Sequence, residues 1–406
     1  MTDTTAAPTV AGLAPNDVVI VDAVRSATAR RNGRLSGKHA TELLGDVLVG
    51  LLDRSPIEAG DVDHVAGGCI NQVGMQGNNI TRTSWLAAGL PLEVPASTTS
   101  TQCGSGQQAT MWAHSLIASG LADIVIACGV ESMTNVPLGS NVPRTDDGGA
   151  MYGERFTPAY EEFYEGTNQF EGGEMIAAQW DLAREELDAF GARSQQLARQ
   201  AWDEGRFDTQ IIPLTAPAPD GDGSIVHDRD EGLRDTTPEA LAGLKATAGE
   251  GGYHTAGTSS QIADAAGALL MMSAAKAGEL GITPLARVVD SCLVGSDPVL
   301  MLTGPMPATE KLLENNGLTT DDIDIYEINE AFGSVVLAWA KELGIEIDER
   351  VNPNGGAIAI GHALGSTGPI LITKTVHELV RSGGRYGLIS MCCGGGLGTG
   401  TLIERL

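Results

Sequence analysis

Apolar and polar positions alternate along the chain with two different periods, and the changes of period mark the predicted elements. Residues 39–55 have the apolar spacing of an amphipathic helix, and residues 61–70 form the continuous apolar run of a buried strand. A Gly-rich turn at residues 101–108 leads into a second helical pattern at 109–119, which is followed by another apolar run at 123–132. The pattern predicts an α/β unit.

The same order of elements recurs in the C-terminal part of the chain. The recurrence predicts, in order, a helix at 307–317, a strand and turn at 321–334, a Gly-rich turn at 361–368, a helix at 370–384 and a strand with glycines at 385–396. A repeated order of this length indicates a duplicated α/β half with mixed sheets.

Superposing the two repeats pairs residues that stand at corresponding turns. Cys103 of the first half corresponds to His362 of the second, and Cys128 with Gly129 corresponds to the region of residues 392–394. Equivalent turns of two related halves can face each other across the interface between the halves. We therefore expect these positions to meet at one site.

Residues 131–250 interrupt the repeat. They are rich in Gly, Pro, Asp and Glu, and residues 142–154 and 216–224 predict loops. Between these loops, residues 174–205 form one amphipathic helical stretch. We expect an inserted loop domain, which is the usual place for substrate contacts.

Beyond the insertion, residues 254–278 predict a polar turn that leads into a buried helix. The length of 406 residues favours two or three domains. We therefore predict an N-terminal half built from residues 1–130 and 251–280, the inserted domain at 131–250, and a C-terminal half at 281–406.

The composition of the chain mainly excludes certain classes of partner. The chain has 25 Lys and Arg against 52 Asp and Glu, which gives a net charge of −27. This charge argues against nucleic acid or an anionic membrane as the main partner, because phosphates repel it. The longest apolar run, Ala265 to Ala275, is too short to span a bilayer, and the N-terminus lacks the features of a signal peptide. We expect a cytoplasmic protein.

The cysteines predict neither a disulfide framework nor a metal site. The chain has 6 of them, at positions 69, 103, 128, 292, 392 and 393. Their density is too low for a disulfide scaffold, and their spacing does not match a zinc site. We expect free thiols in a reducing compartment.

Cys103 and His362 are the first candidates for chemistry. Cys103 stands just before a predicted helix, whose N-terminal partial charge favours a thiolate. His362 also precedes a helix, where the same charge disfavours a protonated imidazole, so the ring could act as a base. The alternatives are a small buried cysteine that packs as a hydrophobe, and a turn histidine that caps local backbone.

Two further segments add candidate groups. Cys392 and Cys393 precede the glycines at 394–396, whose backbone N–H groups could hold an oxyanion. A tight turn or a redox pair of vicinal thiols are the alternatives. Asn329 follows a predicted strand and could simply cap the next helix. Taken together, the thiols, the imidazole, the carboxamide and the Gly-rich loop suit covalent catalysis with a separate acid and base.

Four motifs occur in an order that resembles the thiolase family. They are CGSG at 103–106, NEAFG at 329–333, GGAIAIGHALGSTG at 355–368 and CCGGGLGTG at 392–400. The resemblance implies an α/β fold of two duplicated halves, each with a five-stranded mixed sheet, in α-β-α-β-α layers with an inserted loop domain. It also implies a homodimer or homotetramer that uses coenzyme A (CoA) as co-substrate, with no permanently bound cofactor.

The resemblance also implies roles for individual residues. Cys103 matches the family's nucleophile, His362 the base that activates it, and Cys392 a second acid–base group. Asn329 matches a residue that holds a water, which forms one oxyanion site together with His362. The backbone N–H groups of Cys103 and Gly394 match the other oxyanion site.

Other positions are expected to contact the substrate. Ser260 and Arg234 match family positions near the pantetheine and nucleotide parts of CoA. Asn168, Gln169 and Phe170 stand where short-chain members commonly have His-Met-Gly in the acyl pocket, so we expect a different pocket here. The stretches NQFE, GNNITR and HTAGTSSQIAD resemble actinobacterial thiolases that shorten steroid side chains. A bulky acyl-CoA is therefore the hypothesis for the substrate.

The implied reaction is the cleavage of a 3-oxoacyl-CoA by CoA, which gives acetyl-CoA or propionyl-CoA and a shortened acyl-CoA. It proceeds by ping-pong catalysis through an acyl-cysteine, in lipid or steroid side-chain β-oxidation. A biosynthetic acetoacetyl-CoA thiolase uses the same residues in reverse and is one alternative. Another is a non-catalytic CoA- or lipid-binding relative, although the catalytic residues are present. A decarboxylating ketosynthase would use two histidines with its cysteine, which disfavours that assignment.

Overall fold

The strands of the two halves join into one hydrogen-bonded path. The computed structural model of the chain describes residues 10–142, 167–218 and 221–406. The strands of the N-terminal half are β1 (Val18–Ser26), β2 (Ala29–Arg30), β3 (His64–Gly68), β4 (Ala96–Thr99), β5 (Ile124–Ser132) and β9 (Ala263–Ser273). Those of the C-terminal half are β10 (Ala286–Gly295), β11 (Ile325–Ile328), β12 (Tyr386–Cys393) and β13 (Leu397–Arg405). Because β1 pairs antiparallel with β10, the order β4-β3-β5-β9-β1 continues as β10-β13-β12-β11.

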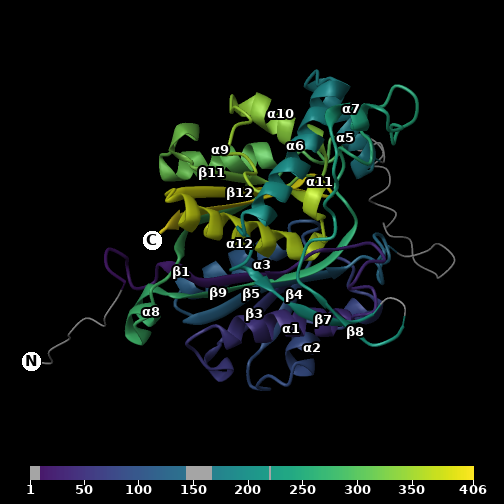
Figure 1. Cartoon of the computed structure of the whole chain (residues 1–406). Coiled ribbons are helices and arrows are strands. Elements are labelled where there is room, and N and C mark those ends of the chain that lie inside the picture. Colours follow the sequence, from purple (N-terminus) through teal and green to yellow (C-terminus); the bar gives the residue numbers. More distant parts are fainter. Residues whose placement is uncertain (1–9, 143–166, 219–220) are drawn as a thin grey trace, which may run out of the picture.

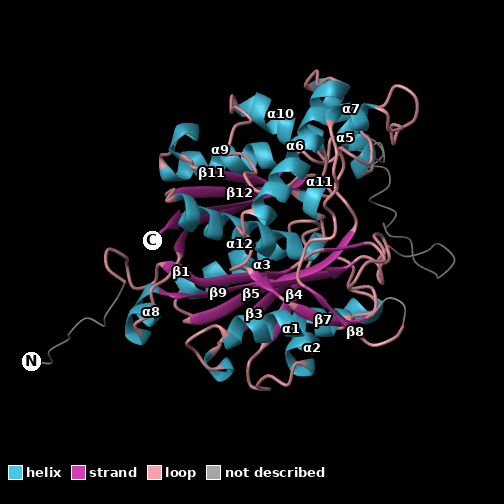
Figure 2. Ribbon diagram, viewed as in Figure 1, coloured by secondary structure: helices cyan, strands magenta, loops and turns pink. Residues whose placement is uncertain are grey.

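Helices cover the outer faces of this sheet path and fill the space between its two halves (Figures 1 and 2). The helices of the described residues are α1 (Ala40–Asp53), α2 (Ile80–Ala87), α3 (Ser105–Ala118), α5 (Gln169–Gln179), α6 (Arg184–Asp203), α7 (Pro238–Ala242), α8 (Ala274–Leu280), α9 (Pro305–Asn316), α10 (Gly333–Leu343), α11 (Ala357–Ile360) and α12 (Leu364–Ser382). In Figure 1, α1 and α2 lie outside the first sheet, α3 and α12 lie between the sheets, and α9 and α10 lie outside the second. The predicted α/β fold with α-β-α-β-α layers is confirmed.

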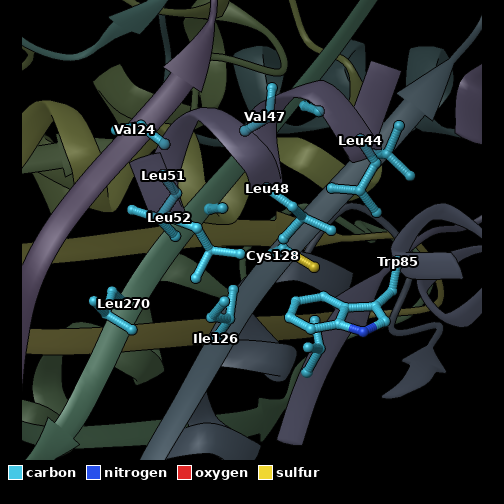
Figure 3. Close-up of a cluster of buried hydrophobic side chains, with 14 of the residues drawn as sticks. Val24, Leu44, Val47, Leu48, Leu51, Leu52, Trp85, Ile126, Cys128 and Leu270 are labelled. Atoms are coloured by element: carbon cyan, nitrogen blue, oxygen red, sulfur yellow. The ribbon is translucent and has the colours of Figure 1, made fainter. Parts of the chain in front are cut away.

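Three main hydrophobic cores hold the layers together. The first core packs α1 and α2 against the outer face of β5 and β9, and Figure 3 shows Leu48, Leu51 and Trp85 beside Ile126 and Cys128. A second core packs α3 and α12 against strands of both halves, and a third lies under α9 and α10. The middle layer is therefore enclosed from both sides, which fixes α3 and α12 relative to each other.

The segment predicted as a buried helix after the insertion is mostly a strand, so that prediction is wrong. The strand β9 is buried along its whole length and pairs antiparallel with β1 on one side and with β5 on the other. A continuous apolar run does not distinguish a buried strand from a buried helix, and its Ala, Leu and Met residues favour a helix. Pairing along both edges overrides that preference. The helix α8 begins only at Ala274, where the Ser273 hydroxyl accepts the N–H of Lys276.

The second sheet departs from the five strands expected of each half. Among the described residues it contains β10, β13, β12 and β11, and its fifth place is an isolated parallel bridge between Tyr326 and Val351. Asn352 has a left-handed φ of 47°, and Pro353 has no N–H to donate. The backbone therefore turns away after one bridge instead of extending a fifth strand.

The inserted residues lie beside both halves, with α5, α6 and α7 next to the C-terminal half and β6 (Ile211–Ile212), β7 (Leu214–Pro217) and β8 (Ser224–His227) next to the N-terminal half (Figure 1). The helices α5 and α6 pack against α10, and the short strand β6 pairs with β1. The strands β7 and β8 pair antiparallel, so the predicted loop at 216–224 includes the strand residues 216, 217 and 224, and its residues 219–220 lie outside the described residues. The predicted loop at 142–154 lies almost entirely outside the described residues. No helix in the described part of the chain is long and apolar enough to cross a membrane.

Candidate active site

Two helix N-termini meet between the sheets, and glycines make their close approach possible. A Cβ on Gly106, in the first turn of α3, would collide with the carbonyl oxygen of Gly365 in the first turn of α12. A Cβ on Gly368 would collide with the backbone of Gln107. The segments just before the two helices therefore lie side by side, as the repeat predicts.

Cys103 stands two residues before α3 and lines a cavity of about 160 Å³. Its side chain packs against Ile70, Met133 and Leu364. Burial raises the pKa of its thiol to about 11, while the backbone N–H groups of Gly394 and of Cys103 itself act in the opposite direction. The local backbone donors act in the direction predicted for a helix start, but burial outweighs them and favours the neutral thiol.

His362 stands at the corresponding place before α12 and lines the same cavity. Its backbone N–H donates to the carbonyl of Gln261 at 2.9 Å, which holds the turn against the segment entering β9. In the ring, Nδ1 lies 2.7 Å from Thr367 Oγ1, and Nε2 lies 3.4 Å from Asn329 Nδ2. The residue is 4% exposed, and burial lowers the pKa of the ring to about 4. A neutral imidazole is the form that can accept a proton.

Asn329 does not cap the helix that follows it. The helix α10 has Phe332 at its N-cap, with no side-chain hydrogen bond there. Asn329 Nδ2 reaches His362, and its buried Oδ1 has no hydrogen-bond partner among the described residues. A buried carbonyl oxygen without a partner, beside the imidazole, is an acceptor that a small polar molecule such as water could satisfy.

The strand β12 carries the second thiol and leads into the Gly-rich loop. Cys392 is fully buried and is not part of the cavity lining, whereas Gly394 is. Burial, followed by repulsion from the charges of Cys103 and Cys393, raises the pKa of Cys392 well above its usual value. The sulfur of Cys393 instead packs against Gly104. The structure thus places Cys392 within electrostatic reach of Cys103 but behind the cavity wall.

All six cysteines are free thiols, and Cys128 is not part of the site. The repeat pairs it with the region of residues 392–394, but its side chain lies in the outer core next to Trp85 (Figure 3). The repeat therefore correctly predicts that Cys103 and His362 meet at the cavity. It does not predict a shared site for Cys128 and residues 392–394, because the side chain of Cys128 points into the outer core.

Apolar side chains form most of the cavity wall. Gln169 and Phe170 line it from the first turn of α5, and Ser260 lines it from the segment before β9. Phe170 packs edge-on against Phe332, with ring centroids 5.6 Å apart, and is 51% exposed. Asn168 instead caps α5, because its Oδ1 accepts the N–H of Phe170 at 2.9 Å.

Much of this wall was not predicted from the sequence. The further apolar lining residues are Ile70, Met133, Leu138, Ile262, Met301, Leu302, Phe332 and Leu364. They come from segments far apart in the chain, so no local pattern links them. The one available signal is adjacency to a motif, since Leu364 follows the His362 turn and Phe332 belongs to NEAFG.

Arg234 lies outside the cavity. It lines two neighbouring surface grooves together with Asp235 and Thr236. Its Nη2 donates to Gln261 Oε1 at 3.3 Å, and Gln261 itself lines the cavity. Arg234 is therefore separated from the cavity by one side chain.

A buried carboxylate behind the cavity connects the two halves, and it was also not predicted. Glu131, at the end of β5, accepts N–H groups from Ile70 at 2.9 Å, from Asn71 at 3.1 Å and from Gly365 at 3.1 Å. Because Gly365 belongs to the first turn of α12, the anion also lies at the positive end of that helix. Glu131 therefore fixes the start of α12, and with it His362, to the N-terminal half.

This arrangement suits the transfer of an acyl group through sulfur. A thiol, a neutral imidazole and backbone N–H groups converge on one small cavity with mostly apolar walls. They supply a nucleophile, a proton acceptor and donors for a developing oxyanion. Poor access of water strengthens each of these polar interactions.

Two thiolase domain profiles cover nearly the whole chain. Residues 18–275 match the thiolase N-terminal domain, and residues 282–405 match the thiolase C-terminal domain. The boundary between the two matches falls between the N-terminal and C-terminal halves of the fold.

Individual relatives are similar over the same length. The chain is 43% identical to the steroid 3-ketoacyl-CoA thiolase FadA6 of Mycobacterium tuberculosis, over 97% of this chain and 96% of that protein. It is 40% identical to an acetyl-CoA acetyltransferase of Syntrophomonas wolfei, over 96% and 99% of the two chains. The crystal structure of the Bacillus anthracis acetyl-CoA acetyltransferase matches with a TM-score of 0.88 at 37% identity, and the match covers 98% of this chain and 100% of that one.

Proposed function

Because the chain belongs to the thiolase family and is an acyltransferase, we propose that it cleaves a bulky 3-oxoacyl-CoA with CoA. The observation that carries the proposal is the shared cavity of Cys103 and His362, which has mostly apolar walls and an aromatic pair at its side. The relative named as a steroid 3-ketoacyl-CoA thiolase supports a large acyl group. We place the reaction in lipid or steroid side-chain β-oxidation, with CoA as co-substrate.

In the first half-reaction Cys103 attacks the 3-keto carbon. Its proton passes to Nε2 of His362 as the C–S bond forms, and the new oxyanion accepts N–H groups. The bond between the α and β carbons then breaks, and its electrons leave on acetyl-CoA as an enolate. Cys392 protonates that enolate, which leaves an acyl-Cys103, a protonated His362 and a thiolate on Cys392.

In the second half-reaction free CoA resolves the acyl-enzyme. The Cys392 thiolate takes the CoA proton, and the CoA sulfur attacks the acyl carbonyl. The tetrahedral intermediate collapses to the shortened acyl-CoA, and Cys103 recovers its proton from His362. Each proton that leaves in the first half therefore returns in the second. The water held by Asn329 and the N–H groups of Cys103 and Gly394 are the proposed oxyanion donors.

The remaining assignments follow the same proposal. Ser260 contacts the pantetheine arm, Arg234 lies toward the nucleotide, and Gln169 with Phe170 borders the acyl group; the cavity lining supports Ser260, Gln169 and Phe170. The groove beside Gln261 supports Arg234.

We also propose the three-part division into residues 1–130 with 251–280, 131–250 and 281–406. Its support is that β9 returns to the first sheet after the insertion. The proposed assembly is a cytoplasmic homodimer or homotetramer, and the free thiols support a reducing compartment.

Trapping of the acyl-enzyme tests the chemistry. Incubation with a 3-oxoacyl-CoA in the absence of free CoA should add one acyl mass, located on Cys103 by peptide mass spectrometry. The Cys103→Ser variant should add none, and Cys292→Ser is the matched control that should still acquire the adduct. An unmodified wild-type protein, or an adduct on another residue, would refute the assignment.

A thiolysis screen across 3-oxoacyl-CoAs of graded size tests the substrate. We expect kcat/KM to rise from acetoacetyl-CoA toward long and polycyclic acyl groups. A strong preference for acetoacetyl-CoA would overturn the bulky-substrate proposal and favour the biosynthetic alternative. Binding of CoA without any turnover would instead favour a non-catalytic relative.

A further inference from the structure

The imidazole of His362 has a second hydrogen bond that the proposed mechanism does not use. Its Nδ1 lies 2.7 Å from the hydroxyl of Thr367, which is in the first turn of α12 and is 3% exposed. This contact is shorter than the 3.4 Å between Nε2 and Asn329 Nδ2. Among the described residues, His362 is the only hydrogen-bond partner of the Thr367 side chain.

With the Asn329 amide oriented so that Nδ2 faces the ring, the two contacts favour one tautomer. Asn329 Nδ2 carries only hydrogens, so it donates, and Nε2 must offer its lone pair. In a neutral ring the proton then sits on Nδ1 and is donated to Thr367 Oγ1. Nε2 is the atom to which the proposed mechanism delivers the thiol proton. The opposite tautomer would present an N–H at that atom and could not accept it.

The hydrogen-bond partner of Nδ1 is a neutral hydroxyl and not a carboxylate, and this difference affects the charge of the ring. Within the described part of the chain, His362 is hydrogen-bonded to no carboxylate. A carboxylate at Nδ1 would stabilise an imidazolium and favour a standing ion pair with a thiolate, whereas a hydroxyl orients the ring without adding charge. Burial, without a counter-charge, keeps the pKa of the ring at about 4.

We propose that Thr367 is a positioning residue that fixes the tautomer and the orientation of His362 by accepting its Nδ1 proton. This inference rests on the proposed role of His362 as the base. The Thr367 side chain is well placed for the task, because its branched Cβ restricts χ1 and because Gly368, next to it, packs on the backbone of Gln107. The hydroxyl is therefore held by the same helix contact that brings the two halves together.

The test compares Thr367→Val with Thr367→Ser. Valine keeps the shape and removes the acceptor, and serine restores the acceptor without the methyl group. We expect kcat of Thr367→Val to fall roughly 10- to 100-fold, with KM changed far less, and Thr367→Ser to recover to within about 3-fold of the wild type. The matched control is Thr375→Val, which removes a buried hydroxyl from the same helix. Among the described residues, that hydroxyl donates only to the carbonyl of Leu371, at 2.8 Å.

Three results would overturn the proposal. They are a Thr367→Val enzyme with wild-type kcat, a Thr367→Ser enzyme as slow as Thr367→Val, or an equal loss in Thr375→Val. Should Thr367→Val fail to fold, heteronuclear NMR of histidine-labelled wild-type protein decides, with His362→Asn used to assign the signals. A proton on Nδ1 at neutral pH supports the proposal, and a proton on Nε2 refutes it. An active His362→Asn enzyme would instead refute the proposed role of His362, so the two failures are distinguishable.

Discussion

The turns before α3 and α12 occupy equivalent places in the two halves, but their side chains experience the site differently. Cys103 and His362 each stand two residues before the first residue of a helix of the middle layer. Among the described residues, the thiol packs against apolar side chains and meets backbone donors, whereas the imidazole is held by the side chains of Thr367 and Asn329. One group is therefore left free to move toward a substrate, and the other is fixed.

Burial raises the pKa of the Cys103 thiol and lowers the pKa of the His362 imidazole. Both shifts favour the neutral form of the group. The pKa of the thiol is raised to about 11 and that of the imidazole is lowered to about 4, so both are neutral near pH 7. A helix N-terminus alone would favour a thiolate. The comparison teaches that the repeat determines where the groups lie and that desolvation determines their charge. For the proposed mechanism, these charges favour proton transfer during the attack of sulfur over transfer before it.

Removing the imidazole gives the largest expected effect. His362→Asn leaves the Cys103 turn intact but provides no base, and kcat for thiolysis should fall about 10²- to 10⁴-fold. The measurement is steady-state thiolysis at saturating CoA. His377→Asn is the matched control, because His377 is a half-buried histidine of α12 whose Nε2 lies 2.9 Å from the carbonyl oxygen of Ala23. If both variants lost activity equally, the proposed role of His362 as the base would be refuted.

The reactivity of Cys103 tests whether the pair is neutral at rest. Because its pKa is about 11, the thiolate is scarce at neutral pH, and iodoacetamide should modify it about 10- to 100-fold more slowly than a free cysteine. The rate should rise nearly tenfold for each unit between about pH 7 and pH 10, since it follows the thiolate fraction. Adduct formation on the Cys103 peptide gives the rate. A plateau near neutral pH that disappears in His362→Asn would reveal a standing thiolate–imidazolium pair and break the comparison.

The contact between the two helices can be disturbed without touching either functional side chain. Gly368→Ala places a Cβ against the backbone of Gln107, which cannot yield as a side-chain tip can. We expect a loss of about 1–3 kcal/mol in the free energy of unfolding, measured by urea titration, together with reduced kcat because the turns separate. Gly60→Ala is the control, since a Cβ there meets nothing within 4 Å. Unchanged stability and activity in Gly368→Ala would show that the approach of the helices is less tight than the structure indicates.

The two turns could be predicted from the sequence alone, because each is marked by residues that are adjacent in the chain. Cys103 and His362 each stand in a short Gly-containing motif before a helical pattern, and the repeated order of elements related the motifs to each other. The error at β9 has the opposite origin. Its apolar run is buried on both faces, so no period reveals its geometry, and only pairing with β1 and β5 makes it a strand.

The rest of the site could not be predicted because it depends on contacts between distant segments. Glu131 holds Gly365 across the two halves, and Met301 meets the cavity from a stretch without a motif. The effect of burial on the pKa of Cys103 could not be predicted for a similar reason, since a sequence shows the helix start but not the apolar neighbours Ile70 and Met133. Local motifs therefore predicted which candidate groups meet at the cavity, and tertiary packing decided their environment.

A substitution of Phe170 in the inserted domain has the smallest expected effect. It tests whether residues outside the two duplicated halves contribute to substrate specificity. Phe170 reaches the cavity from α5 and packs edge-on against Phe332, which belongs to the C-terminal half. An aromatic contact of this kind is worth about 0.5–1.5 kcal/mol, so Phe170→Ala should lower kcat/KM for polycyclic 3-oxoacyl-CoAs about 3- to 10-fold. Acetoacetyl-CoA is too small to fill the same wall and should be affected less. Leu121→Ala, at another exposed apolar position, is the control that should alter neither substrate. An equal loss for both substrates would mean that Phe170 supports the site without contacting the acyl group, and the two reacting turns would then set specificity by themselves.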